Sequence, residues 1–219
     1  MKIIVQPSDA SGEDDKYVIF TIQPRIAAGS LGFTEIPAGM LDGHSFKGAA
    51  ASELHEEAGL EVKEDELINM AELAVDEKPY AGGIDSSGAE SVESAMYPSP
   101  GACDEFIPLF LCQKRLTRRH MDWLKGKATG LRDEGEKITL NLVPLRKAWR
   151  VGARDAKALA ALALYEGLKG ERKIPEMPKD FTKEPEELEV EHEDVERTGK
   201  RRKIEHTELE LDIEAEDVD

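Results

Sequence analysis

The sequence predicts an α+β domain over residues 1–170 and a disordered acidic tail over residues 171–219. One observation is that short apolar or alternating runs, typical of strands, are interspersed with Ala-rich stretches that are typical of helices. A second is that residues 171–219 hold 19 acids, 9 bases and a single aromatic residue, Phe181. A segment of this composition buries too little apolar surface to offset the entropy lost on ordering it.

The strands are predicted from apolar or alternating runs that end at proline, glycine or polar residues. They are expected at residues 17–22, 33–37, 67–75, 106–112 and 138–143. Pro108 favours an edge position or a bulge for the fourth of these strands, because proline cannot donate a hydrogen bond to a neighbouring strand.

Helices are predicted over residues 49–58, 116–125 and 155–168. The first is rich in Ala and Glu and is followed by Gly59, a residue that commonly ends a helix. Residues 76–104 contain several Gly, Ser and Pro and predict a long loop. A loop of that length within a compact domain is usually functional or disordered.

The charge of the chain excludes two classes of partner. With 46 acidic and 29 basic side chains the formal net charge is -17, and such a surface repels nucleic acid and anionic membranes. The longest apolar stretch, residues 158–165, has 8 residues, whereas a membrane span needs about 20. We therefore expect no nucleic-acid partner and no membrane partner.

Two features predict a cytoplasmic location. The first residues lack the apolar core and the small-residue cleavage site of a signal peptide. Cys103 and Cys112 lie nine residues apart and indicate free thiols in a reducing compartment. The basic cluster at residues 200–203 leaves nuclear import open as well, although a patch that balances neighbouring acids explains it equally.

The predicted helix over residues 49–58 concentrates negative charge. At about 100° per residue, Glu53, Glu56 and Glu57 share one face, with an apolar stripe beside them. Like charges at this spacing destabilise a helix unless something compensates them, and a divalent cation held by carboxylate oxygens would do so. A solvated acidic face is the alternative interpretation.

The residues around this helix favour the metal-binding interpretation. Residues 39–60 closely resemble the signature of the Nudix hydrolases, which opens on a glycine and closes on Arg-Glu-apolar-x-Glu-Glu-x-Gly-apolar. Gly39 opens the segment here, and residues 53–60 (ELHEEAGL) close it. Ser52 stands where the signature has its arginine. The stretch before Glu53 is one residue shorter than the pattern and has no clear equivalent of its upstream glutamate.

Four further segments resemble the ADP-ribose and ADP-sugar pyrophosphatase branch of that family: residues 23–25 (QPR), 35–42 (EIPAGMLD), 97–105 (YPSPGACDE) and 130–136 (GLRDEGE). The resemblance implies a Nudix-type α/β/α sandwich with a mixed sheet. It also implies hydrolysis of the diphosphate bond of a nucleoside diphosphate sugar, such as ADP-ribose or ADP-glucose. A UDP-sugar pyrophosphatase is one alternative, and a catalytically weak nucleotide-binding regulator, which Ser52 permits, is another.

The resemblance also implies a metal site. Mg²⁺, with Mn²⁺ as the alternative, would be held by the carboxylates of Glu53, Glu57 and Glu136 and by the backbone carbonyl of Ala38. Bound cations would reverse the local charge, which explains how an acidic protein can bind an anionic diphosphate.

The remaining roles that the resemblance implies concern catalysis and substrate. Glu134 would orient or deprotonate the attacking water, with Glu56 as a second catalytic carboxylate. Arg25 would grip the nucleotide or the diphosphate, and Glu105 would contact the substrate. The resemblance leaves a homodimer open.

Overall fold

The structure is a computed structural model that describes residues 1–39, 60–75, 92–130, 137–185 and 188. The chain divides into two compact units, Met1–Glu184 and Pro185–Asp219. The first unit extends past residue 170, where the composition placed the end of the domain. The predicted helix over residues 49–58 and the predicted disorder of residues 189–219 lie outside the described residues.

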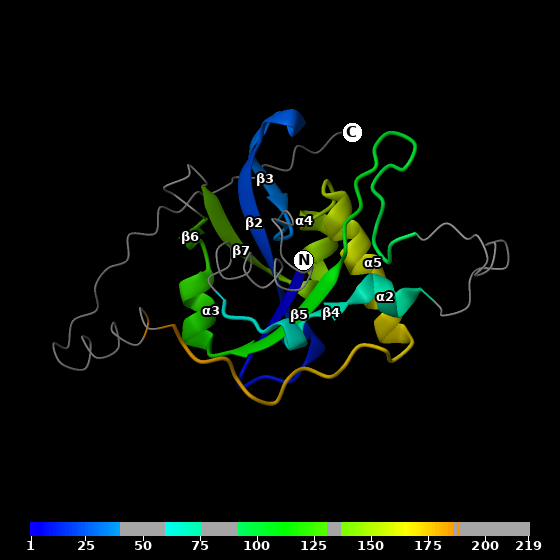
Figure 1. Cartoon of the computed structure of the whole chain (residues 1–219). Coiled ribbons are helices and arrows are strands. Elements are labelled where there is room, and N and C mark those ends of the chain that lie inside the picture. Colours follow the sequence, from blue (N-terminus) through cyan, green and yellow to red (C-terminus); the bar gives the residue numbers. More distant parts are fainter. Residues whose placement is uncertain (40–59, 76–91, 131–136, 186–187, 189–219) are drawn as a thin grey trace, which may run out of the picture. The chain divides into compact units, whose positions relative to one another are not determined.

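The first unit contains a mixed β-sheet of seven strands (Figure 1). They are β1 (Lys2–Pro7), β2 (Tyr17–Arg25), β3 (Ser30–Glu35), β4 (Ile68–Asn69), β5 (Phe110–Leu116), β6 (Ala128–Thr129) and β7 (Ile138–Pro144). The order along the sheet is β4-β5-β1-β2-β7-β6, and β3 pairs with β2. β1 and β5 are parallel, while the other pairs are antiparallel.

β2 organises the sheet because three strands share its two edges. β7 pairs with residues 17–22 of β2 on one edge. On the other edge β1 pairs with residues 17–19, and β3 pairs with residues 21–25. The end of β2 therefore extends with β3 as a hairpin beyond the rest of the sheet.

Helices cover both faces of the sheet. The described helices are α2 (Met70–Ala74), α3 (Arg118–Leu124), α4 (Leu145–Val151) and α5 (Ala156–Gly170), with 3-10 turns η1 (Glu13–Asp15), η2 (Ile26–Ala28) and η3 (Glu64–Glu66). Because neighbouring strand residues point to opposite faces, Ile3 packs into the cluster that contains α3 residues. Ile4 packs into the cluster formed with α4 and α5.

This layered mixed sheet agrees with the α+β prediction, and most predicted elements are present. The strands over 17–22, 33–37 and 138–143 correspond to β2, β3 and β7. The helices over 116–125 and 155–168 correspond to α3 and α5. Thr117 and Asp155 cap those two helices with side-chain oxygens, which explains where each begins.

Two predicted strands were wrong in extent. Residues 67–75 form a two-residue strand and then helix α2, because the Asn69 side chain accepts hydrogen bonds from the N–H groups of Ala71 and Glu72. The strand expected at 106–112 runs instead from Phe110 to Leu116. Its polar residues can be buried because Lys114 pairs with Glu66 and Gln113 binds a backbone carbonyl.

Three of the described helices and strands were not predicted: β1, the two-residue strand β6 and helix α4. β1 is a central strand whose six residues are all buried. Its Lys2 and Gln6 interrupt the apolar pattern, so the segment did not resemble a strand between two others. α4 was also missed, because the basic residues of Leu145–Val151 gave no strong apolar repeat.

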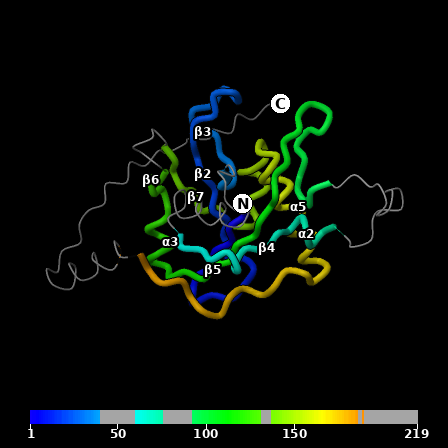
Figure 2. Tube along the Cα trace, in the orientation of Figure 1, coloured from blue at the N-terminus to red at the C-terminus, as the bar shows by residue number. Residues whose placement is uncertain are grey.

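Residues 171–184, here called the C-terminal strap, run along strand β5 (Figure 2). Gln113 Nε2 donates to the Pro175 carbonyl at 2.9 Å, and Arg115 Nε donates to the Pro178 carbonyl at 2.6 Å. The Thr182 N–H donates to the Arg115 carbonyl at 2.7 Å. Backbone and polar hydrogen bonds therefore attach a segment whose apolar content is low, which composition alone could not indicate.

Candidate functional site

The predicted site residues divide into those that the structure describes and those that it does not. Arg25, Ala38 and Glu105 are described. The five acidic residues assigned to metal binding and catalysis lie outside the described residues: Glu53, Glu56, Glu57, Glu134 and Glu136. Their predicted roles therefore stay predictions.

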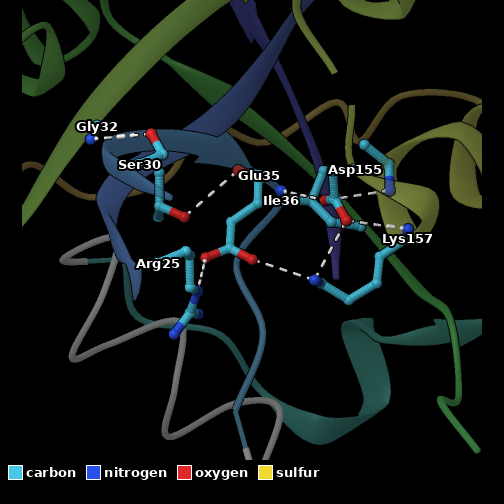
Figure 3. A network of polar contacts seen from close by, with 9 residues as sticks. Arg25, Ser30, Gly32, Glu35, Ile36, Asp155 and Lys157 are labelled. Atoms are coloured by element: carbon cyan, nitrogen blue, oxygen red, sulfur yellow. Dashed lines mark hydrogen bonds and ion pairs between the residues drawn. The ribbon is translucent and has the colours of Figure 1, made fainter. Parts of the chain in front are cut away.

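Arg25 ends strand β2, and its side chain is bound by a buried carboxylate (Figure 3). Arg25 Nε donates to Glu35 Oε1 at 2.6 Å. The Arg25 side chain is 44 % exposed, whereas that of Glu35 is 2 % exposed. The two residues lie on the paired strands of the β2–β3 hairpin, although in the strand register Arg25 pairs with Ser30 and Glu35 with Thr21.

Glu35 has a second cationic partner that comes from helix α5. Lys157 Nζ donates to Glu35 Oε2 at 3.1 Å and lies 3.2 Å from Asp155 Oδ1. Two carboxylates and two cations therefore form one chain of contacts, which we call the Arg25–Asp155 network. A buried carboxylate needs such partners, because an unpaired charge is costly away from water.

Asp155 connects this network to the backbone. Its carboxylate accepts hydrogen bonds from the N–H groups of Lys157 at 3.0 Å and Ala158 at 3.3 Å, which caps helix α5. It also accepts from the Ile36 N–H at 3.2 Å. The same side chain therefore begins a helix and fixes the backbone that leaves β3.

The electrostatics of Lys157 follow from these contacts. Burial of the ammonium lowers its pKa, but the carboxylates of Asp155 and Glu35 outweigh burial and raise the pKa above its ordinary value. Lys157 is therefore charged at neutral pH. The Arg25–Asp155 network pairs two buried carboxylates with two cations.

The carboxylates of the network do not fit a metal site. Glu35 is occupied by two cations, and Asp155 by three backbone N–H groups and the Lys157 ammonium. Within the described ranges, no group of three or more His, Cys, Asp or Glu side chains could hold a metal ion. The metal ligands expected from the resemblance, which are Glu53, Glu57, Glu136 and the Ala38 carbonyl, therefore stay a prediction.

Ala38 lies two residues beyond the Asp155 contact, on the segment that leads into residues 40–59. The segment is held from a second side, because the amino group of Met1 donates to the Pro37 carbonyl. Two anchors therefore fix the backbone next to the predicted carbonyl ligand.

Glu105 is not brought to the Arg25–Asp155 network by any described contact. It is exposed, and it makes no hydrogen bond or ion pair with other described residues. It follows a turn in which the N–H groups of Ala102 and Cys103 donate to the Ser99 carbonyl at 2.9 and 3.0 Å. The structure therefore places Glu105 on a loop and leaves its predicted substrate contact as a prediction.

A cavity of about 450 Å³ lies between the β2–β3 hairpin and the end of helix α4. It is lined by Ala28, Ser30, Gly32, Phe33, Thr34, Arg150, Val151, Ala153 and Arg154. Neither Arg25 nor Ala38 is among these residues. The cavity therefore includes none of the predicted site residues that the structure describes.

Two members of the network were missed by sequence reasoning. Asp155 before an Ala-rich run is a recognisable helix cap, so its position carried a signal. Lys157 carried none, because a lysine in the first turn of a helix is ordinarily a solvated side chain. Lys157 meets Glu35, 122 residues earlier in the chain, because the fold brings α5 to the hairpin.

Comparison with known proteins gives one informative similarity. The chain is 35% identical over 156 residues to Nudix hydrolase 14, chloroplastic, of Arabidopsis thaliana. The match covers 70% of this chain and 45% of the relative, so the chain spans less than half of that protein's length. No family model matches the chain. No helix in the described part of the chain is long and apolar enough to cross a membrane.

The similarity contradicts the expected location. We expected a cytoplasmic protein with a nuclear alternative, but the relative is named as chloroplastic, which points to a plastid. Free thiols indicate a reducing environment and not which compartment provides it, so the cysteines could not distinguish these locations.

The similarity agrees with the signature at residues 39–60, although the ADP-ribose branch is not established by it. Over 70% of its length the chain is therefore similar to a Nudix hydrolase, and its mixed sheet agrees with the fold class that the resemblance implied.

Proposed function

We propose that the chain hydrolyses the diphosphate bond of a nucleoside diphosphate sugar of the ADP-ribose or ADP-glucose type. The products would be a nucleoside monophosphate and a sugar phosphate. The observation that carries the proposal is the 35% identity to a Nudix hydrolase, which supports hydrolysis of a nucleoside diphosphate derivative. The choice of an ADP-sugar rests on the four segments that resemble that branch.

The metal site is part of the proposal. Glu53, Glu57, Glu136 and the Ala38 carbonyl would hold Mg²⁺ or Mn²⁺, which would neutralise charge on the diphosphate and lower the pKa of an attacking water. The Ile36 N–H and the Pro37 carbonyl, just before Ala38, are both held by hydrogen bonds. This supports the role of Ala38, because a carbonyl ligand must be held in place before the ion binds.

The remaining roles concern proton transfer and binding. Glu134 would accept the proton of the attacking water, with Glu56 as a second carboxylate near the reacting atoms. Arg25 would bind the diphosphate through its guanidinium, and its exposure next to a buried partner supports this. Glu105 would contact the sugar or the base.

The test is a product profile with Mg²⁺ over ADP-ribose, ADP-glucose and UDP-glucose. We expect a nucleoside monophosphate and a sugar phosphate, with the ADP-sugars turned over fastest. Preference for UDP-glucose would indicate the UDP-sugar branch. Tight binding of ADP-ribose without turnover would favour the regulator that Ser52, in place of the signature arginine, permits.

A matched pair of variants tests the metal site. Glu57→Gln should abolish turnover, because it removes a proposed ligand, while Glu72→Gln on helix α2 should leave turnover unchanged. Full activity of Glu57→Gln at low Mg²⁺ would contradict the proposal.

A second pair separates the two loop carboxylates. Glu134→Gln should lower kcat by roughly 10²–10⁴-fold at any Mg²⁺ concentration, as expected for loss of a general base. Glu136→Gln should instead raise the Mg²⁺ concentration needed for half activity, and excess metal should partly restore the rate. Identical defects that metal restores in both variants would exclude Glu134 as the base.

A further inference from the structure

The exposed guanidinium of Arg25 has a fixed orientation. Its Nε is bound to Glu35 at 2.6 Å, and its two Nη atoms make no hydrogen bond with the described residues. No residue in the described part of the chain occupies the edge of the guanidinium that carries both Nη atoms, and a guanidinium binds phosphate through two such groups at once.

This orientation depends on the two carboxylate oxygens of Glu35 binding two different cations. Oε1 of Glu35 binds Arg25, and Oε2 binds Lys157 (Figure 3). Without Lys157, Arg25 would be the only described cation next to a carboxylate that is 2 % exposed. Its Nη groups would then turn toward Oε2, because a buried carboxylate gains most from two charge-assisted hydrogen bonds. The edge that faces the ligand would be lost.

Lys157 is itself held in place by Asp155. The ammonium lies 3.2 Å from Asp155 Oδ1, and the Asp155 carboxylate also accepts from the Ile36 N–H at 3.2 Å. The first turn of helix α5 thus fixes both the Arg25 guanidinium and the backbone two residues before Ala38. The proposed function assigns the Arg25 guanidinium to the diphosphate and the Ala38 carbonyl to the metal.

We propose that Lys157 and Asp155 are positioning residues that, through Glu35, present the guanidinium of Arg25 to a diphosphate. The inference rests on the proposed function for the identity of the full substrate. Helix α5 carries none of the predicted site residues. Through these two residues its first turn would nevertheless control how tightly the substrate binds.

The first experiment compares Lys157→Met with Lys147→Met, an exposed lysine on helix α4. Lys157→Met should raise the KM for ADP-ribose roughly tenfold, the usual effect of losing one oriented charged contact, with kcat within about twofold. Lys147→Met should change neither constant. Lys157→Arg, which keeps the charge, should recover most of the affinity, and thermal melting checks that each variant is folded.

A double-mutant cycle tests whether Lys157 acts through Arg25. Lys157→Met added to Arg25→Gln should weaken binding no further, because the group being positioned is already absent. Additive losses in the cycle would mean that Lys157 acts on the substrate by another route and would overturn the inference.

Two measurements distinguish failure of the inference from failure of the proposed function. Binding of inorganic pyrophosphate by calorimetry should weaken in Arg25→Gln and in Lys157→Met but not in Lys147→Met. Exchange of the Arg25 Nε–H with water, followed by NMR, should change in Lys157→Met, because the hydrogen bonds of that guanidinium rearrange.

Absence of nucleoside diphosphate sugar hydrolysis, with these two effects intact, would refute the substrate and support the positioning role. If the wild-type chain does not bind pyrophosphate, or if Lys157→Met binds it as the wild type does, the inference is wrong.

Discussion

Two lysines at helix α5, the half-buried Lys157 and the buried Lys2, have opposite surroundings. Lys157, in the first turn of the helix, lies 3.1 Å from Glu35 and 3.2 Å from Asp155, and its pKa is raised. Lys2 of β1 lies under the middle of the helix, with its Nζ 3.6 Å from the centre of the Tyr165 ring. Among the described residues it has no hydrogen-bond partner, and it is 1% exposed.

The pKa of Lys2 shows what the missing carboxylate contact costs. Burial lowers its pKa to about 7, and the nearby Lys169 and Lys16 add to this, while Glu166 only partly opposes it. The aromatic face favours the charged form, but it does not outweigh burial. The comparison teaches that hydrogen-bonded carboxylates keep the half-buried Lys157 charged, whereas deeper burial without such a contact lowers the pKa of Lys2.

The largest expected effect on stability comes from removing Asp155, a carboxylate partner of Lys157. Asp155→Ala should lower the free energy of unfolding by about 3–5 kcal/mol, because it removes a helix cap and leaves Lys157 with one fewer buried partner. Urea denaturation measures the loss. Asp155→Asn is the control, since its amide oxygen can still cap the helix, and it should lose clearly less. A loss below about 1 kcal/mol in the alanine variant would mean that the network is not stabilising.

Replacing Lys2, which has no carboxylate partner among the described residues, should instead stabilise the fold. Lys2→Met should raise the free energy of unfolding by about 1–3 kcal/mol near pH 6, because a buried charge without a carboxylate partner is replaced by an apolar side chain of similar length. Lys147→Met, on the surface, should have almost no effect. Destabilisation by Lys2→Met at pH 6 would show that the contact with Tyr165 is worth more than burial costs.

The pH dependence sharpens the same point. The folded pKa of Lys2 is lowered to about 7 from 10.5, so the unfolded chain binds more protons between these values. Its contribution to stability should rise as pH increases from 7 to 10.5. The gain from Lys2→Met should therefore shrink across this range, as urea midpoints at pH 6, 8 and 10 would show. A constant gain would place the pKa of Lys2 at its ordinary value.

His120 extends the comparison to acid pH. It is buried in helix α3, and neither ring nitrogen has a hydrogen-bond partner among the described residues. Burial lowers its pKa, Glu184 opposes this, and Lys127 adds to it. Because the unfolded state then binds the proton more strongly, stability should fall as pH drops below 6.5. His120→Phe should flatten this part of the profile, and an unchanged slope would assign it to other groups.

The smallest effect concerns Lys157 at alkaline pH. Its folded pKa is raised, so its contribution is fully present below the ordinary value of 10.5 and is lost as pH rises through the folded pKa. Wild type should therefore lose more stability than Lys157→Met between about pH 10 and 12. Equal losses would mean that the two carboxylates do not raise its pKa.

Much of the fold followed from local patterns. The apolar run at 17–22 and the alternation at 138–143 are strands β2 and β7, and the Ala-rich run after Asp155 is helix α5. The strand expected at 67–75 failed because the side chain of Asn69 caps a helix there. An apolar pattern does not show whether a polar side chain will cap a helix, so the same residues can be interpreted as a strand or as the start of a helix.

The candidate site was predicted in a different way. The acidic signature and Arg25 came from a resemblance, and the structure describes only part of that set. The predicted strand ended at residue 22, whereas β2 continues to Arg25. Its partner Glu35 was noted only as part of a motif. Nothing in a linear pattern indicated that this glutamate is buried between two cations.

By itself the sequence determined the α+β class, the strand and helix types of its strongest segments, and the family signature. These depend on side-chain periodicity, caps and a short motif, all of which are local. Tertiary structure alone decided that β1 is a central strand, that the C-terminal strap joins β5, and that Lys157 meets Glu35 from 122 residues away. The physical reason is that a buried charge or an open strand edge can be satisfied by any suitable partner. Only the folded chain determines which partner comes within hydrogen-bond distance.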